Sequence, residues 1–177
     1  ILRFFRIHAA YGEGAPDRAG YEACIAGRDG LAELSAERIR LEMLKLMVAK
    51  GAAEALVAMD DAGLLLRLTA GVGYHGAFAN MIVAAQQMGP APDAILRLGA
   101  LAVAVTEDAK RLSQRWRLSN AETKRLDSMG HRWWRAAGMD EAIAQRRLYR
   151  LGAARYRDRV MLAWARAGRD AASPSWR

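Results

Sequence analysis

The stretch LSAERIRLEMLKLMVAKG (residues 34–51) decides the fold class of this chain. Ser35 can accept a hydrogen bond from the first turn of a helix, and Glu37 places a negative charge at the positive N-terminal end. Apolar residues then recur at helical spacing. The expected buried face consists of Ile39, Leu41, Met43, Leu44, Leu46 and Met47. The stretch therefore predicts an amphipathic helix that packs against other helices.

The segments that precede this stretch also have helical patterns. Apolar residues recur over residues 1–11, and Gly12 stands where that helix would end. A second helix is expected to begin at Pro16, because proline suits the first turn, and to end at Gly27 or Gly30.

The segments that follow it read the same way. Glycines, prolines and capping residues divide them into short helices. The expected helices are residues 51–62 before Gly63, residues 78–88, residues 93–105, one from Thr106, one from Asn120 behind a capping box of Ser119 and Glu122, and residues 140–167 with a break near Gly152. No convincing period-two strand pattern occurs, so the predicted class is an all-α, multi-helix array.

Composition excludes several classes of protein. The chain has 177 residues, 53% of them hydrophobic, which is enough to build a core. Its single cysteine, Cys24, cannot form an internal disulfide, and a reducing, cytoplasmic location is therefore expected. The longest apolar run, LGALAVAV (residues 98–105), is far shorter than the ~20 residues that span a bilayer, so no membrane segment is expected.

One glycine motif suggests a cofactor site. Gly71, Gly73 and Gly76 have G-x-G-x-x-G spacing, with Asp93 about where a ribose-binding acid would stand. That site requires a parallel strand pair, and the flanking sequence is helical, so a glycine-rich loop between helices is expected instead. The histidines and acids also form no ligand or catalytic set, and we expect no metal, cofactor or catalytic residue in this chain.

The charge is uneven along the chain. Residues 1–88 hold 9 Lys and Arg against 10 Asp and Glu, whereas residues 89–177 hold 18 against 9, which gives net charges of −1 and +9. Sixteen of those 18 cations are arginines, whose planar guanidinium groups match phosphate oxygens. A polyanionic partner is one interpretation, and a solvated helix surface is the other.

A family resemblance favours the first of these interpretations. ILRFFRIHAAYG (residues 1–12) resembles the segment that follows the E-D-x-x-R signature of bacterial CCA-adding enzymes and poly(A) polymerases, where the pattern R-x-x-R-F-x-A-x-x-G matches Arg3 and Arg6. DDAGLL (residues 60–65) resembles a helix end of that family. The stretch described first resembles I-S-x-E-R-I-x-x-E-L-x-K-L-L through Ser35, Glu37, Arg38, Ile39, Glu42, Met43, Lys45 and Leu46.

The resemblance covers roughly residues 1–66 and implies a domain organisation. Residues 1–66 would be a neck-like helical region, and residues 67–177 would be the helical body and basic tail. In the family, a nucleotidyltransferase head precedes these parts, and it binds Mg²⁺ with CTP and ATP. The chain has no initiator Met, and a head is expected before Ile1. The parent protein would be an enzyme, and this chain alone is expected to be inactive.

The resemblance also implies roles for single residues. Arg3 and Arg6 would be remnants of the nucleotide template. Ser35, Glu37, Arg38, Glu42 and Lys45 would be structural residues of the neck, and the spacing of Arg38 and Glu42 would allow them to pair along one helix. Without the head, Ile1, Leu2, Phe4 and Phe5 would lose part of their packing, and weak self-association through this end is expected.

The family implies tRNA as the partner, gripped at its acceptor arm and elbow. The basic strip facing its phosphates would include Lys110, Arg111, Arg115, Arg117, Arg146, Arg147, Arg150, Arg155, Arg157 and Arg159. Trp116, Trp133 and Trp134 are expected mainly to anchor the core. Two alternatives remain at this stage, which are the same region of a poly(A) polymerase and a basic helical interaction module without an RNA role.

Overall fold

The computed structural model describes residues 1–88, 91–136 and 140–168, and all regular elements in these ranges are helical, which confirms the predicted all-α class. Two short 3₁₀ helices, η1 (Arg28–Glu33) and η2 (Trp133–Ala136), interrupt the series. The α-helices are α1 (Leu2–Tyr11), α2 (Arg18–Ala26), α3 (Ala36–Met47), α4 (Ala52–Asp61), α5 (Leu65–Thr69), α6 (His75–Met88), α7 (Ala94–Ala102), α8 (Thr106–Trp116), α9 (Asn120–Gly130), α10 (Glu141–Leu151) and α11 (Ala153–Ala167).

Side chains at the helix starts fix many of these boundaries. The Ser35 hydroxyl accepts a hydrogen bond from the Arg38 amide, and the Ser119 and Glu122 side chains form the predicted reciprocal capping box. The Asp140 carboxylate accepts a bond of 2.8 Å from the Ile143 amide. Helix boundaries in this chain therefore follow local chemistry that the sequence displays.

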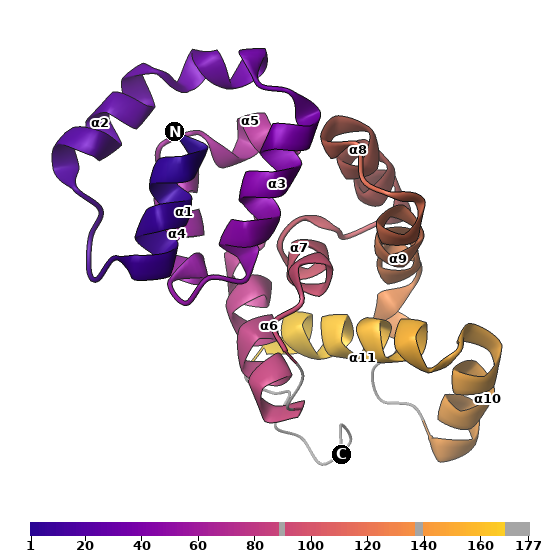
Figure 1. The fold of residues 1–177 in the computed structure, drawn as a ribbon. Coiled ribbons are helices and arrows are strands. Elements are labelled where there is room, and N and C mark those ends of the chain that lie inside the picture. Colours follow the sequence, from indigo (N-terminus) through magenta and orange to yellow (C-terminus); the bar gives the residue numbers. More distant parts are fainter. Residues whose placement is uncertain (89–90, 137–139, 169–177) are drawn as a thin grey trace.

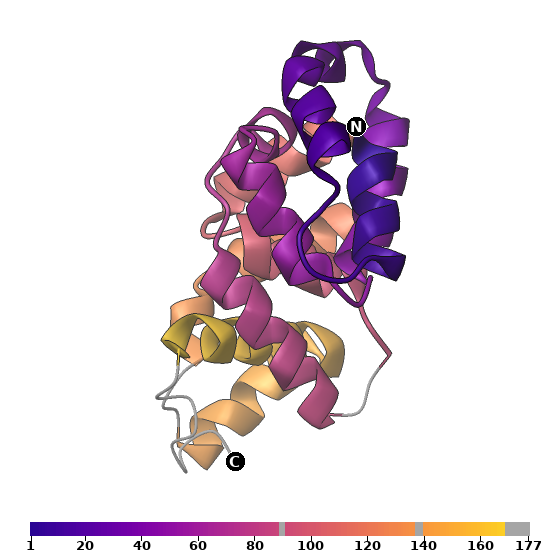
Figure 2. The ribbon, with the colours of Figure 1, turned by 90° about the vertical axis from the view of Figure 1, so that its left-hand side faces the viewer.

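The helices form an elongated array (Figures 1 and 2). Helices α1, α3 and α4 pack together at one end, and α6 and α7 lie in the middle. Helices α8 and α9 pack against each other as a pair, while α11 crosses α6 and carries α10 at the other end. Within the described residues, no helix has both the length and the apolar character needed to cross a bilayer.

A single cluster of buried apolar side chains runs from α1 to α11. Phe5, Met43 and Leu56 join α1, α3 and α4, and Trp116 is fully buried at the end of α8. Arg97 of α7 lies inside this cluster, where its Nη1 donates to the carbonyl oxygen of Met47 at the end of α3, at 2.8 Å. The predicted division at residue 66 stays a prediction.

Several expected helix boundaries are wrong by a few residues. The second helix begins at Arg18 rather than at Pro16, because the Asp17 carboxylate caps it by accepting a bond from Gly20. Helix α6 begins at His75, three residues before the expected start at Phe78. Helix α7 ends at Ala102, because Val103 is extended.

The glycine motif belongs to helical structure, as expected. Gly71 and Gly73 lie in the loop between α5 and α6, and Gly76 lies in the first turn of α6. The segment after α4 is itself helical, and no strand occurs among the described residues to build a dinucleotide site. The Asp60 carboxylate at the end of α4 contacts Nε2 of His75 at 2.8 Å, which ties this loop to α4.

Two expectations about buried faces are also wrong. Leu41 is 52% exposed, because it lies on the face of α3 away from α1 and α7, whereas Ile39, Met43, Leu46 and Met47 are buried. Leu2 and Phe5 are buried, and Ile1 and Phe4 pack partly buried against the core, so these four residues do not lose their cover. Self-association through this end stays a prediction without the exposed surface that motivated it.

Candidate nucleic-acid interface

Helix α3 is held against other helices by ion pairs that its own sequence does not predict. Arg6 of α1 donates from Nε to a Glu42 carboxylate oxygen at 2.6 Å, with both side chains largely shielded. The expected pairing of Glu42 with Arg38 is therefore wrong, because α1 packs beside α3 and offers a closer partner than the exposed Arg38 does. Arg3 and Lys45 are exposed. The role of Arg3 and Arg6 in a nucleotide template stays a prediction.

Two ion pairs join α3 to the basic second half. Arg40 donates from Nη2 to both carboxylate oxygens of Glu122, at 2.7 and 2.9 Å. Burial raises the pKa of Glu122, but the bonds from Arg40 and Ser119 outweigh it, and the net pKa lies below its usual value. Arg117 donates to Glu37 at 2.6 Å on the surface. Ion pairs thus join α3 to the end of α8 and to α9.

Two of the arginines expected in the basic strip donate to the carbonyl end of a helix, and their contact with RNA stays a prediction. Nε of Arg115 and Nε1 of Trp116 both donate to the Leu68 carbonyl oxygen at 2.9 Å, and Nε of Arg111 donates to the Thr69 carbonyl oxygen at 3.2 Å. These carbonyl groups lie at the C-terminal end of the short helix α5, where carbonyl oxygens have no amide partner within the helix. Arg111 and Arg115 therefore hold α5 in place.

Two further arginines hold α11 against its neighbours. Arg125 contacts the buried Asp158 carboxylate and also that of Asp93, which caps α7. Arg166 lies over the ring of Tyr74 at 4.1 Å and of Trp133 at 5.1 Å, and donates to the Val103 carbonyl oxygen at 2.7 Å. These arginines serve packing.

Five other arginines gather in one hollow. It has a volume of about 300 Å³ and lies where the end of α9, η2, α10 and α11 meet. We name this hollow the arginine pocket, and its lining residues are His131, Arg132, Arg135, Arg147, Arg150, Leu151 and Arg159. The structure thus brings together three predicted RNA contacts, Arg147, Arg150 and Arg159.

Hydrogen bonds to backbone oxygens fix two of these guanidinium groups. Arg147 donates from Nη1 to the Arg135 carbonyl oxygen at 2.6 Å, and Arg159 donates from Nε to the Ser128 carbonyl oxygen at 2.7 Å. Burial, with the nearby charges of Arg147 and Arg155, lowers the pKa of Arg159, although the charge of Asp127 opposes this effect. The lining of the pocket therefore carries an excess of positive charge, from five arginines.

The other predicted contacts lie outside this pocket. Arg155 and Arg157 line a second hollow with Lys124 between α9 and α11, and Asp158 also lines it. Arg146 lies on the exposed surface of α10, and Lys110 is exposed on α8. These side chains extend the basic surface along α8 to α11.

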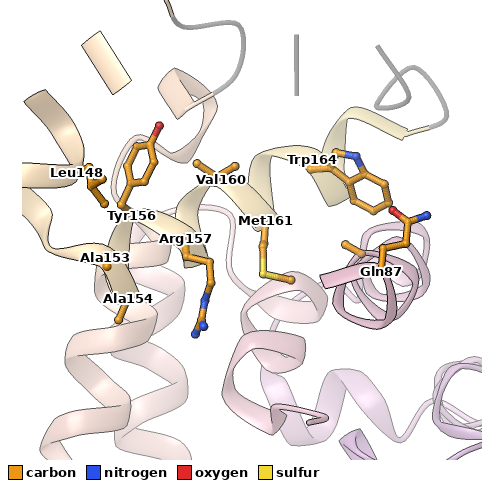
Figure 3. A pocket seen from close by; sticks show the side chains of 10 residues that line it. Gln87, Leu148, Ala153, Ala154, Tyr156, Arg157, Val160, Met161 and Trp164 are labelled. Atoms are coloured by element: carbon orange, nitrogen blue, oxygen red, sulfur yellow. The ribbon is translucent and has the colours of Figure 1, made fainter. Parts of the chain in front are cut away.

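An apolar groove borders the same helices (Figure 3). It has a volume of about 650 Å³ and runs along α11 between α6 and α10. Figure 3 shows Tyr156, Val160 and Met161 along one helix, and Trp164 beside Gln87 at the other end. Its character is apolar, in contrast to that of the arginine pocket.

Sequence reasoning missed His131, Arg132 and Arg135, which follow α9. The signal was present, because Arg132 and Arg135 stand three residues apart beside two tryptophans. Those tryptophans differ in their surroundings: Trp133 packs against the core and donates to the Ala104 carbonyl oxygen at 2.9 Å, whereas Trp134 is 52% exposed. The expectation of a core role is therefore wrong for Trp134, and it is confirmed for the buried Trp116.

Comparison with known proteins gives a family match for part of the chain. Residues 19–69, which include α2, η1, α3, α4 and α5, match the family model described as "Probable RNA and SrmB- binding site of polymerase A". A search of curated proteins gave no match. The matched segment ends at the carbonyls that Arg111 and Trp116 cap. Residues 19–69 are thus similar to a region described as a probable RNA-binding site of polymerase A.

Proposed function

We propose that this chain is the RNA-binding helical portion of a tRNA nucleotidyltransferase. It would hold the acceptor arm and elbow of tRNA and place the 3′ end for CCA addition by a head that precedes it in the parent protein. The observation that carries the proposal is the match over residues 19–69. The ion pair of Arg40 with Glu122, which fixes that segment to the basic helices, supports a shared RNA surface.

The chemistry of nucleotidyl transfer would belong to the head of the parent protein. There Mg²⁺ would bind with CTP or ATP, because a two-metal transfer requires converging acidic ligands. Among the described residues, no three His, Cys, Asp or Glu side chains lie close enough to hold a metal ion. No step of the transfer is therefore assigned to these residues, and their contribution is to position RNA.

The same region of a bacterial poly(A) polymerase is the second candidate, since the matched family is named for polymerase A. The test compares three partners of the chain at several salt concentrations: tRNA that lacks CCA, an unstructured RNA of the same length, and phosphatidylserine vesicles. We expect tighter binding of tRNA, with a logarithm of affinity that falls linearly with the logarithm of salt concentration.

Equal affinity for the two RNAs would overturn the tRNA assignment and favour the poly(A) alternative. Preferential binding to the vesicles would overturn an RNA role altogether and favour the module without RNA.

A further inference from the structure

We propose that the arginine pocket binds one phosphate group, supplied by the backbone of the bound RNA. The inference rests on the proposed function, because it takes RNA as the partner. It adds a discrete site at which a phosphate enters the protein, where a flat basic surface would offer only diffuse attraction.

The lining of the pocket fits a phosphate. Five guanidinium groups, one imidazole and Leu151 line the space, and none of the described residues places an acidic side chain in the lining. The hollow between α9 and α11 differs, because Asp158 and its partner Arg125 are part of its lining. Guanidinium groups donate two parallel hydrogen bonds to phosphate oxygens, so several arginines around one hollow suit that ligand better than a carboxylate or a neutral group.

The pocket is organised before any ligand arrives. The hydrogen bonds of Arg147 and Arg159 to backbone oxygens each occupy one guanidinium nitrogen. The other nitrogens of these two groups donate no hydrogen bond to the described residues, so they are available to a ligand. Arg147 and Arg150 lie three residues apart on one face of α10. Groups fixed in advance lose little conformational freedom when they bind, which strengthens binding.

Nearby acidic side chains do not offset the positive charges of the arginine pocket. The acid next to Arg159 in the sequence, Asp158, gives its carboxylate to Arg125. Asp127 is the acid whose charge reaches Arg159, and the charges of Arg147 and Arg155 act more strongly in the opposite direction. A phosphate in the hollow would offset this repulsion.

The test uses a double variant that spares the structural bonds. Arg135→Gln with Arg150→Gln removes two exposed pocket charges whose side chains donate no hydrogen bond to other described residues. The matched control is Arg18→Gln with Arg28→Gln, which removes two exposed charges outside the pocket to which no RNA contact is assigned. If the first variant does not fold, Arg132→Gln with Arg150→Gln replaces it.

Two measurements separate the sources of phosphate. The first is the thermal midpoint in inorganic phosphate against chloride at equal ionic strength, because a ligand that binds only the folded state raises it. The second is tRNA affinity across salt concentrations. We expect phosphate to raise the midpoint of the wild type and the control but not of the pocket variant. We also expect the pocket variant to bind tRNA about tenfold more weakly than the control.

Other outcomes overturn the inference. If the two double variants bind tRNA equally and phosphate leaves the wild-type midpoint unchanged, the pocket is not a phosphate site. A phosphate shift that the pocket variant loses, with tRNA affinity equal to that of the control, would assign the pocket to free phosphate and not to RNA. A wild-type chain that binds no tRNA would overturn the proposed function, and the phosphate shift would still report whether the pocket binds an anion.

Discussion

Arg125 and Asp158 form the most enclosed ion pair among the described residues, with Nε of Arg125 at 2.5 Å from one carboxylate oxygen and Nη2 at 3.0 Å from the other. The Asp158 side chain is only 2% exposed. Burial lowers the pKa of Arg125, but the bonds to Asp158 and Asp93 outweigh it and raise the pKa overall. One arginine thus joins α9, α11 and the start of α7.

Loss of this arginine should destabilise the fold. Arg125→Met leaves the buried Asp158 carboxylate with only its longer contact to Arg157 at 3.7 Å, and we expect the free energy of unfolding to fall by about 3–5 kcal/mol. Urea unfolding measures the change. Lys124→Met is the matched control, because Lys124 is exposed, and its effect should stay within about 0.5 kcal/mol. Equal effects of the two substitutions would show that the pair contributes little.

Stability in acid should depend on Glu122. Its pKa is lowered in the folded state, so its contribution is present above the ordinary value near 4.5 and is lost as the pH falls through the lower folded value. Glu122→Gln keeps the cap but removes the charge that faces Arg40, and it should cost about 1–2 kcal/mol at pH 7. The difference from the wild type should shrink below pH 4.5.

Urea unfolding at pH 7 and pH 3 measures this dependence on pH. Glu107→Gln, in the exposed first turn of α8, is the control. A penalty for Glu122→Gln that is the same at both pH values would contradict the role of the charge.

Gly130, the last residue of α9, lies against the backbone of Val105 and Thr106. A Cβ at this position would lie 2.6 Å from the Val105 carbonyl oxygen and 2.8 Å from the Thr106 amide nitrogen, and neither atom can move alone. Gly130→Ala should therefore destabilise the fold by about 1–3 kcal/mol. Gly76→Ala enters open space inside α6 and should stabilise it by about 0.5–1 kcal/mol. Thermal unfolding of the two variants, with opposite shifts expected, checks the assignment.

We expect Arg115 to contribute to stability but not to RNA binding, and Arg150 to contribute to RNA binding but not to stability. Arg115→Gln removes the bond to the Leu68 carbonyl oxygen and should lower stability by about 1–2 kcal/mol, with the salt dependence of tRNA binding unchanged. Arg150→Gln should leave stability within about 0.5 kcal/mol and reduce the slope of log affinity against log salt by about one unit. Paired urea and tRNA titrations measure both. If Arg115→Gln reduced the salt slope and Arg150→Gln lowered stability instead, the RNA contact would be assigned to α8.

Much of the fold could be predicted because helix boundaries depend on neighbours in the sequence. The Ser35 cap, the box of Ser119 and Glu122, and the break at Gly152 involve groups within one turn of each other. The start of the second helix was misplaced because two local signals competed, and the Asp17 cap prevailed over Pro16. Local chemistry thus decides which segments are helical.

Partners across helices could not be predicted, because they depend on which helices pack together. Arg38 is one turn from Glu42 on α3, yet Arg6, 36 residues away, pairs with Glu42. Arg115 and Arg150 are both exposed arginines in basic helical segments, and only their neighbours distinguish a helix cap from a pocket lining. The sequence by itself determined the helices and the excess of positive charge in the second half. The tertiary structure alone decided which arginines hold helices together and which face one pocket, since a long side chain acts where packing places its charge.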